Sequence, residues 1–335
     1  MKIVKSSVSI LPQEPGVDGL MKHVEKLGRI AYLSEDRMTE DSWEKFDKML
    51  YNRGHWAVFN SGTVYLDVPV NYGTEDLLLE LERTTSPYTK ICYSDDNNHC
   101  YLTTNLRVIY QKKLEDFMNE YWCEPTEYHY HRVTSVWVCS RGIQTELVRH
   151  RIMSFIAEST RYVGYNKGRY GGELTYILPQ WIYRVRNNIG NTVDSLTGLP
   201  RNYILDLDGQ DLWDHLTVYD RTVASRDRLW REIENEYLYE TTTDEGEKLK
   251  PEEARGGLCN DLKSVVGVTG YIEDFIKEPE EDTLENEGFF HLRCAKDAHL
   301  DMQILANDLK QQFIDTGLYN CLLYTSPSPR DMRRS

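Results

Sequence analysis

The sequence has 335 residues, of which 28% are charged and 40% are hydrophobic, and its formal net charge is −15. This composition is typical of a soluble globular protein with one large domain or two ordinary ones. No apolar run approaches the roughly 20 residues needed to span a bilayer. Non-specific nucleic-acid binding requires a basic surface. We therefore expect a protein that binds neither membranes nor nucleic acid.

The cysteines and the start of the chain bear on its compartment. There are seven cysteines, and no two of them form a C-x-x-C pair. An odd number of isolated cysteines argues against a zinc site or a disulfide framework and favours reduced thiols. The first ten residues lack the apolar core and cleavage site of a signal peptide. We expect a cytoplasmic protein without a bound metal.

Residues 17–50 are predicted to be helical, because apolar residues recur there in steps of three and four. These apolar positions are Leu20, Met21, Val24, Leu27 and Ile30, and then Trp43, Phe46 and Leu50. The segment 63–69 has the composition of a strand. Residues 101–109 have that of a short strand or the beginning of a helix.

Three histidines have alternative interpretations. His55 follows Gly54, which lets the backbone turn sharply and expose the imidazole. On spacing alone, a lone histidine beside a tryptophan is more typical of a structural role than of catalysis, and the catalytic alternative stays open. His129 and His131 alternate along the chain, and no cysteine or aspartate lies at metal-ligand spacing from them. We expect no metal there.

A strand followed by a helix is predicted near the middle of the chain. Residues 133–139 have strand composition, and Ser140 is suited to cap a helix that begins near Arg141. The apolar stripe of this helix consists of Ile143, Leu147 and Val148. Glu146 and Arg149 lie three residues apart and therefore share a face.

The end of this helix and the loop after it are rich in cationic side chains. Arg149, His150 and Arg151 are followed by seven residues, then by Ser159 and soon by Arg161. Arginine presents a planar fork of donors that suits phosphate and carboxylate oxygens. In an acidic chain, this cluster on a loop indicates a local site for a small anionic ligand. A solvated cluster of charges is the alternative.

The rest of the chain is less informative. The glycine-rich loop at 165–172 matches neither the Rossmann nor the P-loop pattern. Helical periodicity over residues 289–306 predicts an amphipathic core helix that carries Arg293. Residues 321–331 resemble the conceptual translation of a sequencing adapter. We therefore expect 321–335 to be a non-native tail without function.

Four pieces of the chain, taken together, resemble the flavin-dependent thymidylate synthases. The family signature is R-H-R, seven residues and a serine, which Arg149–Arg151 and Ser159 match. Gly54-His55 resembles the early histidine motif of the family. Ala254-Arg255 with Leu258 resembles the segment that carries a phosphate-binding arginine. Leu292-Arg293 with Ala298 resembles the C-terminal helix whose arginine activates the uracil.

The chain also departs from the family pattern. Ile156-Ala157 stand where many members have Asn-Glu, and Glu158 is the acidic residue, as in a subgroup of the family. The other departures are Asn60-Ser61, Cys259 and Asp297-Ala298-His299. They concern individual flavin contacts more than the nucleotide site. The alternative is a degenerate nucleotide- or flavin-binding protein without synthase activity.

The resemblance implies a fold and an activity. The fold would be α+β, with a mixed or antiparallel sheet flanked by helices, of the thymidylate synthase complementing-protein type. A single domain would cover residues 1–320, with insertions at 184–250 and 276–288. The activity would be the methylation of dUMP to dTMP, with methylenetetrahydrofolate as carbon donor and FAD, reduced by NADPH, as hydride source. The family is a homotetramer with active sites shared between subunits.

The resemblance also implies roles for individual residues. The residues expected to bind dUMP are Glu146, Arg149, Ser159, Arg161, Arg255 and Arg293. Arg293 would in addition be catalytic, because it can stabilise negative charge on the uracil. The residues expected near FAD or the folate are His55, Arg149, His150, Arg151 and Glu158.

Overall fold

The computed structural model describes residues 2–160, 174–180, 225, 227–233, 255–278 and 288–319. The strands within these ranges are β1 (Lys2–Val4), β2 (Ser7–Leu11), β3 (Thr63–Pro69), β4 (Lys90–Tyr93), β5 (His99–Asn105), β6 (Arg132–Ser140), β7 (Ser154–Ala157), β8 (Thr175–Ile177) and β9 (Lys263–Tyr271). The helices are α1 (Gly16–Tyr32), α2 (Ser42–Asn52), α3 (Glu75–Thr85), α4 (Leu106–Lys112), α5 (Glu115–Tyr121), α6 (Arg141–Leu147), α11 (Ile272–Ile276), α12 (Phe289–Arg293) and α13 (Leu300–Asp315). Short 3-10 turns lie at Glu35–Arg37, Val58–Asn60 and Arg255–Gly257.

The strands form three sheets. A four-stranded sheet has the order β2-β6-β9-β7, and a three-stranded sheet has the order β3-β5-β4. Every strand pair in these two sheets is antiparallel. A third, two-stranded sheet pairs β1 with β8 in parallel. With the surrounding helices, this confirms the predicted α+β class with mixed or antiparallel sheets.

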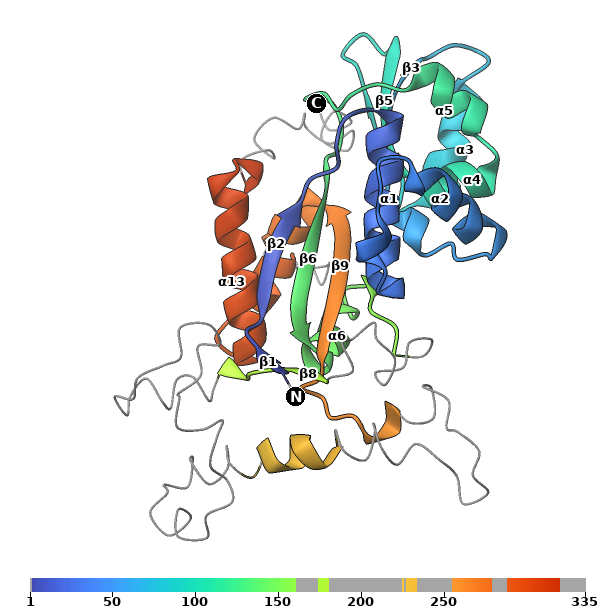
Figure 1. Ribbon diagram of the computed structural model, residues 1–335. Helices are drawn as coiled ribbons and strands as arrows, with labels where there is room; N and C mark the ends of the chain where they lie inside the picture. The colour runs from blue at the N-terminus through green and yellow to red at the C-terminus, as the bar shows by residue number, and fades with distance from the viewer. Residues whose placement is uncertain are drawn as a thin grey trace, which may run out of the picture.

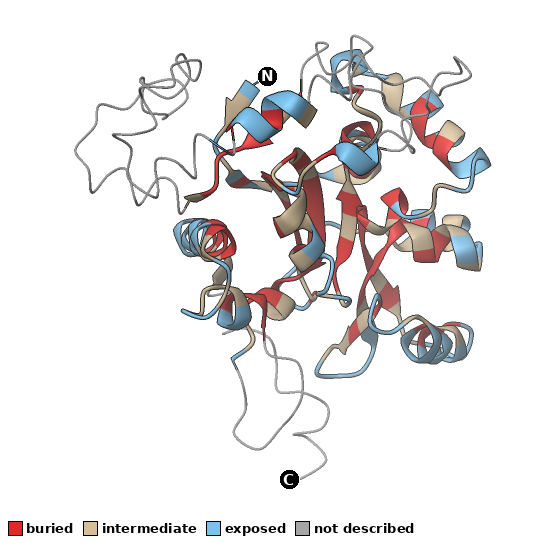
Figure 2. Cartoon of the chain, turned by 90° about the horizontal axis from the view of Figure 1, so that it is seen from below, coloured by how far each residue is buried: buried red, intermediate tan, exposed pale blue. Residues whose placement is uncertain are grey.

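Helices cover the four-stranded sheet from two sides. In Figure 1, β2, β6 and β9 stand between α13 on one side and α1 on the other. One core lies between this sheet and the C-terminal helices, and its largest buried side chains include Trp137, Phe275, Phe289 and Phe313. A second core lies among α1, α2 and the three-stranded sheet. Figure 2 shows the buried residues on the strands and the inward faces of the helices.

The predicted helical region 17–50 is divided in two. The buried side chains of α1 include Leu20, Val24 and Leu27, which confirms the apolar stripe. The helix ends at Tyr32, because the following residue, Leu33, has a left-handed φ of 49° that stops the helical hydrogen bonding. Helix α2 then packs closely on α1 at Gly28, where an added Cβ would lie 2.7 Å from the Phe46 ring.

The predicted helix over residues 289–306 is also divided. Helix α12 ends at Arg293, and α13 begins at Leu300. His299 caps α13, because its side chain accepts a hydrogen bond from the Asp301 amide. Helical periodicity continues across this break, so the pattern alone concealed it. Arg293 is therefore the last residue of a short helix rather than part of a long one.

The outer edge of β2 is closed by a side chain of α13. The amide of Ile10 donates to Gln312 Oε1 at 3.0 Å. Gln312 Nε2 donates to the carbonyl of Val8 at 2.9 Å. A side-chain amide thus satisfies the two backbone groups that a neighbouring strand would otherwise satisfy.

Several predictions concern residues that the structure does not describe. Most of the insertion expected at 184–250, much of that expected at 276–288 and the whole of the tail 321–335 lie outside the described residues. The glycine-rich loop at 165–172 and Arg161 also lie outside them. The single-domain boundary of 1–320 stays a prediction. Among the helices that the structure describes, none is long and apolar enough to cross a membrane.

Candidate active site

The motif Arg149–Arg151 lies at the end of a strand–helix unit. Strand β6 ends at Ser140, whose Oγ accepts a hydrogen bond from the Ile143 amide at 3.2 Å and so caps α6, as predicted. Burial of Ile143 and Leu147 confirms two members of the predicted stripe. The third, Val148, was wrongly assigned: it lies after the helix has ended, and it is 43% exposed.

A compact turn carries the motif. The amides of Arg149 and His150 donate to the carbonyls of Glu146 and Leu147, and the Met153 amide donates to the His150 carbonyl. Strand β7 follows, where the sequence predicted only a loop. It pairs with Thr269–Val266 of β9, so long-range pairing rather than local composition fixes it.

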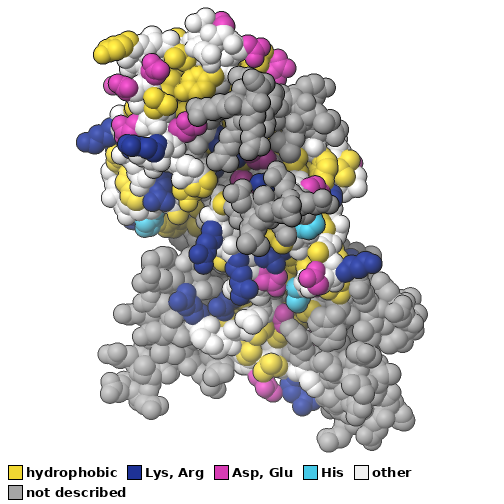
Figure 3. Space-filling view, turned by 180° about the vertical axis from the view of Figure 1, so that it is seen from behind, with side chains coloured by type: hydrophobic (Ala, Val, Ile, Leu, Met, Phe, Trp, Pro, Cys, Tyr) yellow, Lys and Arg dark blue, Asp and Glu magenta, His cyan; other side chains and the backbone are white. Residues whose placement is uncertain are grey.

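The two arginines of the motif point away from the core. Arg149 and Arg151 are exposed. Among the residues that the structure describes, neither guanidinium group has an ion-pair partner. Figure 3 shows lysine and arginine side chains gathered on one face of this otherwise acidic molecule. Unpaired, exposed guanidinium groups suit an anionic ligand.

His150 and Arg293 are brought together although 143 positions separate them. Arg293 Nε donates to His150 Nε2 at 2.7 Å. Arg293 Nη1 lies 3.6 Å from Glu146 Oε2, and Nη2 donates to the Glu146 carbonyl at 3.4 Å. Burial, followed by the charge of Arg293, lowers the pKa of His150 to about 4. His150 of the R-H-R motif and Arg293 of the C-terminal helix motif thus form one contact group with Glu146.

Glu158 is held by the neighbouring strand. Its Oε1 accepts from Lys263 Nζ at 2.9 Å, and its Oε2 accepts from the Val265 amide at 3.0 Å. The residue is buried. Burial raises the pKa of this carboxyl, although Lys263 and the Val265 amide act in the opposite direction. Both carboxylate oxygens therefore have partners within the chain.

Arg255 lies near the start of α6. It is exposed and begins the 3-10 turn Arg255–Gly257. The chain after this turn is bonded to α6, because Arg141 Nη1 donates to the Leu258 carbonyl at 3.5 Å and the Gly142 amide donates to the Asn260 carbonyl at 3.0 Å. Ser159 is half-buried and follows Glu158 in the sequence.

His55 belongs to the other core. Its Nδ1 is hydrogen-bonded to the Tyr32 hydroxyl, and the two rings stack with centroids 5.8 Å apart. Its backbone is bonded to Leu50 and Val58. In the described part of the chain it has no hydrogen bond or ring contact with the motif, Arg255 or Arg293. These contacts are those of a structural histidine; its predicted place beside the flavin or folate stays untested.

His129 and His131 have internal partners. His129 Nε2 lies 3.2 Å from the Leu66 carbonyl, and Nδ1 accepts from the Thr126 amide at 3.1 Å. His131 Nε2 lies 3.0 Å from the Thr126 carbonyl. The described residues contain no group of three potential metal-ligating side chains.

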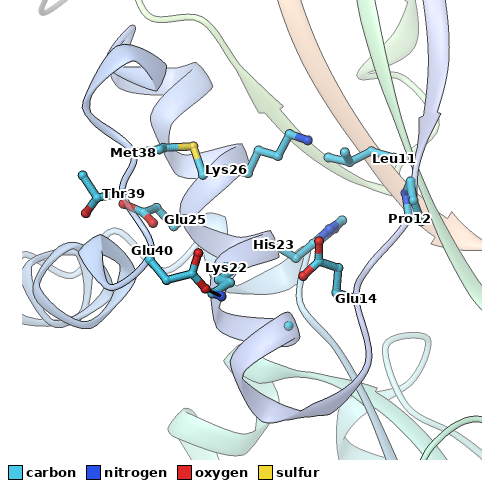
Figure 4. Close-up of a pocket in the computed structure, with 11 residues that line it drawn as sticks. Leu11, Pro12, Glu14, Lys22, His23, Glu25, Lys26, Met38, Thr39 and Glu40 are labelled. Carbon is cyan, nitrogen blue, oxygen red and sulfur yellow. Dashed lines mark hydrogen bonds and ion pairs between the residues drawn. The ribbon is translucent and has the colours of Figure 1, made fainter.

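A pocket of about 500 Å³ lies elsewhere, on the side of α1 (Figure 4). Its charged groups are largely engaged with one another: Lys22 pairs with Glu40, and Glu25 pairs with Arg29 at 2.7 Å. His23 is buried in its wall, 3.1 Å from Thr134 Oγ1, and burial lowers its pKa to about 4. This pocket contains no residue of the motif.

Lys263 is the site residue that the sequence did not indicate. It opens a strand rich in β-branched residues, and its partner Glu158 is 105 positions away. No local spacing connects the two. In the sequence, Lys263 cannot be distinguished from an exposed lysine at the end of a strand. Only the fold shows that it pairs with Glu158.

Together, the described residues define a class of site. Exposed arginines of one turn lie beside a guanidinium that is held by Glu146 and His150, at the edge of an antiparallel sheet in an α+β fold. This arrangement is suited to an anionic ligand with a group that gains negative charge.

The chain belongs to the thymidylate synthase complementing protein family, whose model matches residues 80–316. Glu146, the Arg149–Arg151 motif, Arg255 and Arg293 lie within the matched range, and His55 lies outside it. A comparison with curated proteins finds no match.

Solved structures with similarity to the chain include two nucleotide enzymes. Thymidylate synthase X from Helicobacter pylori, with FAD and dUMP, is 12% identical, with 91% of this chain and 92% of that chain covered and a TM-score of 0.32. The UMP/dUMP methylase PolB from Streptomyces cacaoi, bound with 5-Br UMP, is 12% identical, with 98% and 99% covered and a TM-score of 0.36. Both scores are low, and the family assignment rests on the family match.

Proposed function

We propose that the protein methylates dUMP at C5 to give dTMP, with methylenetetrahydrofolate as the carbon donor and with FAD, reduced by NADPH, as its cofactor. The observation that carries the proposal is the contact group of Arg293, His150 and Glu146 beside the exposed R-H-R arginines. It joins the two motifs that the nucleotide and the flavin would require, within a chain of this family.

The nucleotide phosphate would be bound by Arg255 and Arg161, with the hydroxyl of Ser159. Arg255 is exposed at the start of a short turn, which leaves its guanidinium accessible to a phosphate. Charge-assisted bonds from arginine to phosphate are short and often bidentate. Arg149 and Glu146 would contact the same nucleotide from the end of α6.

Arg293 would act on the uracil ring. C5 becomes nucleophilic when the ring gains negative charge, and a fixed cation beside the ring stabilises that charge. Because the Arg293 guanidinium is already oriented by its partners, little reorganisation is needed as the charge develops. Such a group typically lowers the activation free energy by a few kcal/mol.

The residues of the motif fit a cofactor with phosphate groups. Arg149 and Arg151 are exposed and have no ion-pair partner in the described ranges, so their donors suit the two phosphates of FAD. When bound, reduced FAD supplies the hydride of the reaction. The protein binds and orients the reactants and excludes water. Contacts of His55, His150 and Glu158 with FAD or the folate stay predictions.

A homotetramer with shared active sites and a cytoplasmic location complete the proposal. Arg149 and Arg151 are accessible in the single chain, which allows them to serve a site completed by a neighbouring subunit. Sedimentation analysis of the purified protein tests the assembly.

The decisive experiment is an anaerobic assay for dTMP with dUMP, FAD, NADPH and methylenetetrahydrofolate. We expect a yellow protein that forms dTMP. The variant Arg293→Ala should lose about 100- to 1,000-fold in turnover, as expected for a charge-stabilising donor. The matched control is Arg83→Ala on the exposed face of α3. Binding of dUMP or FAD without any dTMP formation would instead identify a degenerate binding protein.

A further inference from the structure

His150 lies between two exposed arginines but faces inward. Its ring is half-buried and meets the edge of Phe289 in a T-shaped contact, with centroids 4.9 Å apart. Phe289 begins α12, the helix that ends with Arg293. His150 therefore contacts both ends of this short helix, whereas its neighbours Arg149 and Arg151 face solvent.

The hydrogen bond to Arg293 fixes the protonation state of the histidine. Arginine nitrogen atoms only donate, and the guanidinium does not lose its proton in proteins. Because Arg293 Nε donates at 2.7 Å, His150 Nε2 must accept with a lone pair. The ring proton is therefore on Nδ1, and the imidazole is neutral.

A neutral acceptor has an advantage at this position. Arg293 is at the end of a five-residue helix, which by itself orients a long side chain poorly. Glu146 holds the two terminal nitrogens, at 3.6 Å through its carboxylate and at 3.4 Å through its carbonyl. His150 holds the remaining nitrogen without adding a second negative charge. The guanidinium thus keeps more of its positive charge for a ligand.

We propose that His150 is a positioning residue for Arg293, which it orients through a hydrogen bond to its neutral Nε2. The catalytic part of this inference rests on the proposed function. His150, the central residue of the R-H-R motif, then acts through the side chain of Arg293 and not only through a contact with the cofactor. Protonation of the imidazole would remove the acceptor and place two cations side by side.

The charged groups around His150 agree with this role. Burial and Arg293 lower its pKa to about 4, and its sequence neighbours Arg149 and Arg151 are also cationic. Glu146 is the acidic group at the end of α6, and it faces Arg293. The imidazole is therefore neutral throughout the neutral pH range. The contact is lost only as the pH falls through about 4.

Two variants of the holoenzyme test the role in turnover. His150→Gln retains an oxygen acceptor on a side chain of similar length, and His150→Ala removes the acceptor. We expect His150→Ala to lower kcat about 100-fold, as a misplaced catalytic group does, and His150→Gln to recover at least about tenfold of that loss. Equal kcat values for the two variants, with changes only in FAD affinity, would overturn the proposal.

A measurement that is independent of turnover tests the contact itself. Nitrogen NMR of the histidine side chains in the full-length protein reports the tautomer, and the His150→Gln variant identifies the signal. In the wild type, we expect His150 to be the Nδ1–H tautomer and to stay neutral down to about pH 5. In Arg293→Gln, we expect the pKa of His150 to rise and its two neutral tautomers to be mixed. An Nε2–H tautomer would overturn the positioning contact. Absence of dTMP formation by the wild type would overturn the proposed function instead.

Discussion

Glu158 occupies a position in the motif where the resemblance places a cofactor contact. Its two oxygens are bonded to Lys263 and to the Val265 amide, and its own amide donates to the Val265 carbonyl. Glu158 directly precedes Ser159. The ion pair with Lys263 thus fixes the point at which the motif leaves the sheet.

We predict that Glu158 and Lys263 are energetically coupled. Their side chains are 3% and 24% exposed, so each loses most of its solvation and depends on the other. A double-mutant cycle of Glu158→Gln and Lys263→Met, followed by denaturant unfolding, should give a coupling energy of about 1–3 kcal/mol. Additive effects of the two substitutions would contradict the prediction. Lys263→Arg, which retains the charge, serves as the control.

Asp47 is a buried carboxyl of α2 without a hydrogen-bond partner in the described part of the chain. Neither of its oxygens is bonded to any residue that the structure describes, and the residue is 3% exposed. Burial, and then the charge of Glu25, raise its pKa to about 8, while Arg29 acts in the opposite direction. From α4, Tyr110 also faces this group. Asp47 is therefore protonated in the folded protein at neutral pH.

The titration of Asp47 should make stability depend on pH. Between its ordinary pKa of 3.8 and about 8, the unfolded chain has released the proton and the folded chain retains it. The stability contribution is complete below 3.8 and is lost as the pH rises to about 8. The slope is at most about 1.4 kcal/mol per pH unit.

The variant Asp47→Asn does not titrate. Its stability relative to the wild type should therefore rise between pH 4 and pH 8, the window of the raised pKa, and level off above it. Urea unfolding at several pH values, with the exposed Asp76→Asn on α3 as the control, measures the difference. A difference that does not change with pH would show that Asp47 is ionised in the folded state.

At the scale of elements, α6 depends on its cap. The helix has only seven residues, so few internal hydrogen bonds stabilise it, and the Ser140 hydroxyl satisfies one free amide. Ser140→Ala should destabilise the protein by about 1 kcal/mol. Because Glu146 lies in the last turn of α6 and Arg149 follows the helix, the same variant should bind dUMP more weakly.

Thermal unfolding and dUMP titration measure the two effects of Ser140→Ala. Ser140→Thr retains a hydroxyl acceptor and should remain close to the wild type in both measurements. Equal loss in both variants would show that packing, rather than the cap, holds α6.

The elements that sequence reasoning identified are those with a complete local pattern. Strand β3 has the predicted bounds of 63–69, and the predicted strand 133–139 lies within β6. Strand β7 was missed because four residues beside an arginine cluster have no clear period, and their partner β9 is distant in sequence. The break before α13 was missed because periodicity continues through Cys294–His299.

At the site, too, sequence reasoning identified what a local pattern shows and missed what depends on distant segments. The family resemblance predicted Glu146, His150 and Arg293 as functional residues, and the structure places Arg293 in contact with both others. Spacing could not give the direction of the His150 ring or the pairing of Lys263, because both depend on segments more than 100 positions away. Arg161 lies outside the described residues, and its role stays a prediction.

At the scale of the whole molecule, a half-buried arginine connects the two larger sheets. Arg132 begins β6, and its Nη2 donates to the Asn60 carbonyl at 2.8 Å next to β3. Its guanidinium lies 5.6 Å from the centre of the Tyr271 ring, and the Tyr271 hydroxyl donates to the Thr103 carbonyl of β5 at 2.9 Å. Ile156 of β7 packs in the second core and against the first sheet. These contacts fix the Arg149–Arg151 motif relative to both the four-stranded and the three-stranded sheet.

The hydrogen bonds between Gln312 and β2 have a consequence for the order of folding. They connect positions 302 and 304 residues apart, and the central pair β6–β9 also joins distant segments. During synthesis, β2 emerges early, but its outer edge remains open until α13 has left the ribosome. Contacts of such long range form slowly, and an open strand edge can pair with another chain. The nascent protein is therefore most prone to aggregate just before α13 is complete.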